Sequence, residues 1–185
     1  MNRNSIAFKL AFAGVLAALS IVLVTFIHFP LIPALAFLEY DPADIPILIT
    51  SVVLGPVYGI AVTLIVAIIQ GLTVSFNSGV YGIIMHIIST GTFVLSVGLL
   101  SRRRKKSYHL PLYLGIGIIA VTAVMIPANL IVTPIFMGQP VSAVVSYLPL
   151  IILFNFLKSL INAVLAFLIF TVLEKARVLK SIGLG

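Results

Sequence analysis

The apolar stretch YLPLIILFNFLKSLINAVLAFLIFTVL, residues 147–173, carries one charged side chain, Lys158, in 27 residues. A helix needs about 20 apolar residues to cross the hydrocarbon core of a bilayer, so this stretch is long enough to span a membrane. A lysine near the middle of such a helix costs about 2.5–3.5 kcal/mol on insertion scales. Because Lys158 lies too far from either end to reach water by snorkelling alone, we expect its ammonium group to face an internal polar cavity.

Two asparagines share the helix face of Lys158. Asn155 precedes the lysine by three residues and Asn162 follows it by four, and residues at these spacings project from one side of a helix. This pattern predicts that Asn155, Lys158 and Asn162 form the wall of a cavity and contact a ligand there. The alternative is that they only join helices, with Lys158 paired to Glu39 or to backbone carbonyls.

The composition of the whole chain is typical of a membrane protein. Hydrophobic residues make up 62% of the 185 residues and charged residues 8%, which is more apolar surface than a soluble domain of this length can bury. There is no long hydrophilic block, so we expect one embedded domain, residues 1–185. The net charge of +7 does not indicate a nucleic-acid partner, because ten of the eleven basic residues lie at the two ends and in one loop.

Proline and glycine punctuation predicts six transmembrane helices in an all-α bundle. The first apolar segment is longer than the h-region of a signal peptide, so we expect a retained helix rather than a cleaved leader. With six crossings, all three basic segments fall on one side, which the positive-inside rule assigns to the cytoplasm together with both termini. The chain is therefore expected to be a multi-pass protein of the cell membrane. The expected helices lie at about 5–28, 42–55, 56–75, 80–100, 110–136, and from 142 or 146 into the basic tail.

Further polar residues inside or beside the helices are candidate ligand contacts. Asn129, in the fifth expected helix, offers two donors and an acceptor, which suit the edge of a planar heterocycle. The first loop holds Glu39, Asp41 and Asp44, of which one could bind ligand hydroxyls while Asp41 alternatively caps the second helix. Secondary candidates are Gln70 and His86, and for each of them a satisfied interior position is the alternative.

Small residues on the first helix form overlapping pairs four residues apart, a spacing that lets two helix backbones approach closely. These residues predict either internal packing or a surface for a partner protein. No phosphate-binding loop, zinc-protease motif or nucleophile elbow occurs in the sequence, and the three histidines are scattered. We therefore expect no enzyme activity, no metal and no cofactor. The small residues are Ala13, Gly14, Ala17 and Ala18.

Four segments together resemble the substrate-binding (S) components of energy-coupling factor (ECF) vitamin transporters, and specifically the riboflavin-specific S components. The acidic entry to the second helix, residues 39–46, is similar to the family's Asp-x-x-Asp-Val/Ile-Pro segment. The junction at 54–59 and Asn129 ahead of Pro134 also match. The most specific element is residues 149–158, in which a proline leads into Asn155-x-x-Lys158.

This resemblance implies the fold, the ligand and the partners. Asn129, Asn155 and Lys158 would bind the isoalloxazine ring of riboflavin, and Glu39 and Asp44 would lie near its ribityl chain. FMN remains open as a second ligand. The small residues of the first helix would dock against a transmembrane coupling subunit, which works with two ATPase subunits, and the loaded protein would tilt in the membrane to release its ligand inward.

Two rival functions remain at this point. One is an S component for another vitamin, such as thiamin, biotin or a folate. The other is a small self-sufficient transporter, coupled to ions or protons, that uses Lys158 and Glu39 as a charge pair.

Overall fold

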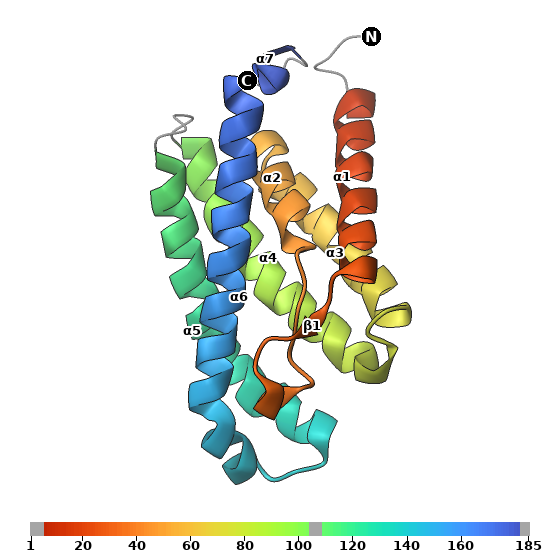
Figure 1. Cartoon of the computed structure of the whole chain (residues 1–185), viewed down its shortest axis with the longest axis vertical. Coiled ribbons are helices and arrows are strands. Elements are labelled where there is room, and N and C mark those ends of the chain that lie inside the picture. Colours follow the sequence, from red (N-terminus) through yellow and green to blue (C-terminus); the bar gives the residue numbers. More distant parts are fainter. Residues whose placement is uncertain (1–5, 104–108, 182–185) are drawn as a thin grey trace.

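The structure is a computed structural model that describes residues 6–103 and 109–181, and it consists mainly of α-helices (Figure 1). All six predicted helices are confirmed, with ends within a few residues of the expected ones; a short seventh helix follows them. The helices are α1 (Ile6–Phe26), α2 (Asp44–Leu54), α3 (Pro56–Leu72), α4 (Gly79–Arg103), α5 (Leu110–Met137), α6 (Val141–Lys175) and α7 (Val178–Ser181).

Glycine and proline end the helices where the sequence places them. Gly55 separates α2 from α3 with a φ of 103°, a backbone conformation that residues other than glycine rarely adopt. Pro56 then opens α3, where its missing N–H would have no intrahelical partner anyway. Gly138 ends α5 in the left-handed region, with a φ of 60°.

The helices differ in length. Among the described residues, four segments are long and apolar enough to cross a membrane: α1, α4 with the turn before it, α5 and α6. The helices α2 and α3 have 11 and 17 residues, which is short for the roughly 20 residues that a full crossing needs. Their crossing stays a prediction.

The two ends of the bundle are distinct (Figure 1). The start of α1, the end of α4, the start of α5 and the end of α6 lie at one end, and the first loop and the turn from α5 to α6 lie at the other. This is the pairing of ends that six crossings predict. Arg3 and the core of the basic loop, residues 104–106, lie outside the described residues, and the cytoplasmic assignment stays a prediction.

The first loop has an internal structure that the helix pattern did not reveal. Strand β1 (Phe29–Pro30) pairs antiparallel with β2 (Glu39–Tyr40), and the 3-10 turn η1 (Pro33–Leu35) lies between them. Leu35 is almost fully buried and packs with Val144 and Ile151 of α6. The loop is thereby held against α6 at the end of the bundle away from the termini (Figure 1).

Close approach of α4 and α5 depends on a glycine. A Cβ on Gly117 of α5 would lie 2.6 Å from the ring of Phe93, which is 1% exposed on α4. Helix α2 is also joined to α4, because Ser51 Oγ donates a hydrogen bond of 2.9 Å to the Val94 carbonyl. These contacts fix α4 as one wall of the space between the helices.

Candidate ligand-binding site

A cavity of about 140 Å³ lies among the first loop, α3, α4, α5 and α6. Its walls include six of the residues that the sequence proposed as ligand contacts. Two further candidates, Asp44 and Asn162, lie behind the wall. The six lining residues are Glu39, Gln70, His86, Asn129, Asn155 and Lys158.

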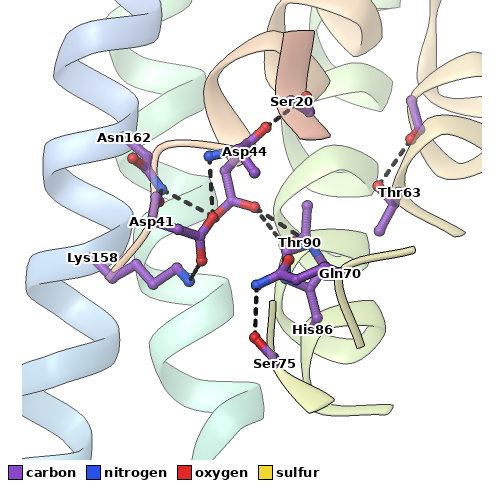
Figure 2. A network of polar contacts seen from close by, with 12 residues as sticks. Ser20, Asp41, Asp44, Thr63, Gln70, Ser75, His86, Thr90, Lys158 and Asn162 are labelled. Atoms are coloured by element: carbon purple, nitrogen blue, oxygen red, sulfur yellow. Dashed lines mark hydrogen bonds and ion pairs between the residues drawn. The ribbon is translucent and has the colours of Figure 1, made fainter. Parts of the chain in front are cut away.

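Lys158 faces this cavity but is already paired (Figure 2). Its Nζ donates a hydrogen bond of 2.7 Å to Asp41 Oδ2 and lies 3.4 Å from the Glu39 carbonyl oxygen. The expected alternative partner, the Glu39 carboxylate, instead lies 3.5 Å from His28 Nδ1 near the surface. The pairing of Lys158 with the side chain of Glu39 was therefore wrong, because Asp41 is the loop carboxylate that points inward.

Asp41 is a buried carboxylate with three kinds of partner. Its side chain is 2% exposed, and its Oδ1 accepts a hydrogen bond of 3.1 Å from the Ala43 N–H. Burial acts to raise the pKa of the Asp41 carboxyl, but Lys158, His86 and the Ala43 N–H together lower that pKa below its ordinary value. Asp41 is not the N-cap of α2, as the sequence had suggested, because α2 begins at Asp44 and Ala43 occupies the cap position.

The amides of Asn129 and Asn155 are buried in the cavity wall and anchored to their own helices. Asn129 Nδ2 donates a hydrogen bond to the Met125 carbonyl, and Asn155 Nδ2 donates one to the Ile151 carbonyl; each of these hydrogen bonds is 2.8 Å long. An amide nitrogen carries two hydrogens, so each of these donors retains one for another acceptor. Anchoring fixes the orientation of both amides before a ligand arrives.

Behind the wall, Asn162 joins α6 to the first loop (Figure 2). Its Oδ1 accepts a hydrogen bond of 3.0 Å from the Tyr40 hydroxyl, and its Nδ2 lies 3.2 Å from the Asp41 carbonyl and 3.1 Å from Asp44 Oδ2. The Thr90 hydroxyl donates a hydrogen bond of 2.7 Å to the other carboxylate oxygen of Asp44, Oδ1. Asp44 and Asn162 thus tie α2, α4 and α6 together.

Gln70 and His86 lie on the opposite wall of the cavity, on α3 and α4 (Figure 2). Gln70 Oε1 and His86 Nε2 are buried side-chain atoms for which the described residues supply no hydrogen-bond partner. The nearest acid to His86 Nε2 is Asp44 Oδ1 at 3.9 Å, too far for a hydrogen bond. Leaving such atoms unpaired costs about 1–3 kcal/mol each. The α3–α4 wall therefore has more unmet hydrogen-bonding capacity than the wall that holds Asn129, Asn155 and Lys158.

Sequence reasoning missed the importance of Asp41 and the roles of Tyr40 and Thr90. The sequence did not single out Asp41 among the three loop carboxylates, because the pairing of β2 with β1 decides which of them points inward. Tyr40 and Thr90 gave no signal either, because their role depends on how the loop and α4 meet.

Comparison with known proteins identifies the family of the chain. A sequence profile described as "ECF transporter, substrate-specific component" matches residues 8–173. The chain belongs to this family. It is therefore a multi-pass membrane protein, in agreement with its long apolar helices.

Two similar proteins are informative about this S component. The riboflavin transporter RibU of Streptococcus thermophilus is 29% identical over 175 residues, which cover 90% of this chain and 82% of RibU. A solved structure described as the S component of a bacterial ECF transporter superimposes with a TM-score of 0.81 at 27% identity. That match covers 90% of this chain and 95% of the solved one. The predicted S-component bundle is confirmed.

The small residues of α1 divide between two faces of this S component. Ala13 and Ala17 are 7% and 6% exposed and belong to the apolar core. Gly14 and Ala18 face outward, and a Cβ built on Gly14 meets nothing within 4 Å. Two of the four small residues therefore serve internal packing, and the other two, Gly14 and Ala18, form an exposed strip along α1.

Proposed function

We propose that this S component captures riboflavin in the cavity beside Lys158 and carries it across the membrane as the specificity subunit of an ECF transporter. The observation that carries the proposal is a cavity wall built from one ammonium group and two anchored amides, Lys158, Asn155 and Asn129. The similarity to RibU supports riboflavin as the ligand, and it favours riboflavin over thiamin, biotin or a folate.

The chemistry of this wall suits the pyrimidine-like edge of a flavin. That edge alternates carbonyl and nitrogen groups, so it presents acceptors and a donor in one plane. The second hydrogens of the Asn129 and Asn155 amides and the ammonium of Lys158 are donors, and the amide oxygens are acceptors. Glu39 lines the loop side of the same cavity, and in this proposal it would accept hydrogen bonds from ligand hydroxyls.

Energy for transport would come from other subunits. The proposed partners are a transmembrane coupling subunit and two ATPase subunits, with the outward strip of α1 at Gly14 and Ala18 as the contact surface for the coupling subunit. The S component itself would catalyse no reaction, and riboflavin would be its cargo rather than a cofactor.

Equilibrium binding to the purified protein in detergent tests this function. We expect a yellow preparation or, after the flavin is removed, stoichiometric rebinding of riboflavin. The Lys158→Ala variant should lose at least about tenfold in affinity, as expected when a charged hydrogen bond of about 1.5–3 kcal/mol is lost. The matched control is Lys175→Ala, at an exposed position near the end of the same helix.

Two results would contradict the proposal. One is a folded wild-type protein that binds no riboflavin. The other is equal affinity in wild type and Lys158→Ala. Tight binding of thiamin, biotin or a folate in place of riboflavin would assign the chain to another vitamin, and ligand transport into vesicles without ATPase subunits would favour the self-sufficient transporter.

A further inference from the structure

The charged residues that line the cavity carry more negative than positive charge. Within the described part of the chain, three residues with formal charges line the cavity: Glu39, Asp41 and Lys158. Two carboxylates therefore face one ammonium, counting histidine as neutral. A third carboxylate, Asp44, lies directly behind the wall and is 3% exposed. The cavity has a surplus of negative charge.

Within this group, the contact between Asp41 and Lys158 determines what a ligand meets. The two side chains are 2% and 14% exposed, and their charged atoms are 2.7 Å apart. Charges at this distance and this degree of burial interact strongly, because little water lies between or around them to screen them. The ammonium is thus already compensated by the protein, and an anionic ligand would gain little from it.

We propose that Asp41 sets the charge preference of the site: by neutralising Lys158 it makes the cavity select an uncharged ligand over an anionic one of the same shape. This inference rests on the proposed function. Riboflavin is uncharged, whereas FMN carries a phosphate of about −1.5 to −2 at neutral pH. The phosphate would enter a cavity whose cation is occupied and whose remaining carboxylates repel it.

Asp41, rather than Glu39, is the determinant because of where the two carboxylates lie. The side chain of Glu39 is 39% exposed and lies beside His28, so water and salt screen its charge. Asp41 is buried and directly bonded to the cation. Removal of the Asp41 charge also frees the ammonium of Lys158. A single substitution therefore changes both the net charge of the cavity lining and the availability of the Lys158 ammonium to a ligand.

The test compares dissociation constants for riboflavin and FMN in the purified full chain. In the wild type, FMN should bind more weakly than riboflavin. The isosteric Asp41→Asn variant should lower the ratio of the FMN to the riboflavin dissociation constant by about tenfold or more, as expected for one charge several ångströms away at an effective dielectric constant of about 20. Asp41→Glu, which keeps the charge, should retain a high ratio, and Glu39→Gln should change it by less than Asp41→Asn does.

A second variant addresses the risk that Asp41→Asn does not fold. Ser78 lines the same cavity at a half-buried position, so Ser78→Lys adds an ammonium to the lining without altering the buried pair. This variant should also lower the ratio. An unchanged ratio in a folded Asp41→Asn or Ser78→Lys protein, or equal wild-type affinity for FMN and riboflavin, would overturn the proposal.

The same data separate this inference from the proposed function. If the wild type binds riboflavin but Asp41→Asn leaves the ratio unchanged, the charge assignment fails and the proposed function stands. If the folded wild type binds neither flavin, the proposed function itself fails.

Discussion

At the scale of single residues, two asparagines on one face of α6 have different roles. Asn155 lines the cavity and bonds to its own helix. Asn162 lies about two turns further along and bonds to Tyr40 and Asp41 of the first loop and to Asp44 at the start of α2. The same chemical group therefore lines the cavity at one position and joins elements of the fold at the other.

This difference predicts opposite outcomes for the two alanine variants. Asn162→Ala leaves several buried polar groups unpaired, so it should lower the free energy of unfolding by at least about 1–3 kcal/mol. Asn155→Ala should change stability less but weaken riboflavin binding by about three- to tenfold, the effect of one hydrogen bond of about 0.5–1.5 kcal/mol. Unfolding in detergent and flavin titration measure the two quantities. Equal stability losses with equal affinities would show that the two roles are not distinct.

At the scale of elements, the contact between α4 and α5 depends on the absence of one methyl group. The space above Gly117 is filled by Phe93 and Val97, whereas a Cβ on Gly115, half a turn away on α5, meets nothing within 4 Å. The two glycines thus form a matched pair on one helix.

We expect Gly117→Ala to destabilise the protein by about 1–3 kcal/mol, the usual cost of overpacking a core. Gly115→Ala should be neutral or stabilising by up to about 1 kcal/mol, because alanine favours a helix over glycine. Thermal unfolding of both variants in the same detergent measures the difference. A Gly117→Ala protein as stable as Gly115→Ala would contradict the observed packing of α4 on α5.

The outward strip of α1 gives a second prediction at this scale. Gly14→Leu and Ala18→Leu should keep riboflavin affinity, because both residues lie outside the cavity, but they should reduce assembly with the coupling subunit by about tenfold or more if close backbone contact is required. Co-purification with the coupling and ATPase subunits measures assembly, and Gly115→Leu on α5 is the control. Normal assembly of both α1 variants would remove this strip from the interface.

At the scale of the whole molecule, the sequence predicted the helices well and the loop poorly. Runs of apolar residues ending at Gly55-Pro56 or Gly138 specify a helix and its end locally, so α1 to α6 could be predicted. The inward position of Lys158 could also be predicted, because a charge in an apolar helix has few tolerated environments. The β1–β2 hairpin had no such local signature.

The choice of Asp41 as the partner of Lys158 was beyond the sequence for the same reason. Glu39, Asp41 and Asp44 lie within six residues, and alternation along a short strand and turn decides which of them points inward. That decision depends on the pairing of β2 with β1 and on the packing of Leu35 against α6. These are long-range contacts, and spacing along the chain does not encode them.

In the proposed function, a flavin occupies the space between the α6 wall and the α3–α4 wall, beside a lysine that the protein has already neutralised. An experimentally determined structure of the riboflavin-bound protein tests it most directly. We predict the isoalloxazine ring within hydrogen-bonding distance of Asn129, Asn155 or Lys158, with Asp41 still beside the ammonium. A flavin bound elsewhere, or a Lys158 side chain directed into lipid, would contradict this binding mode.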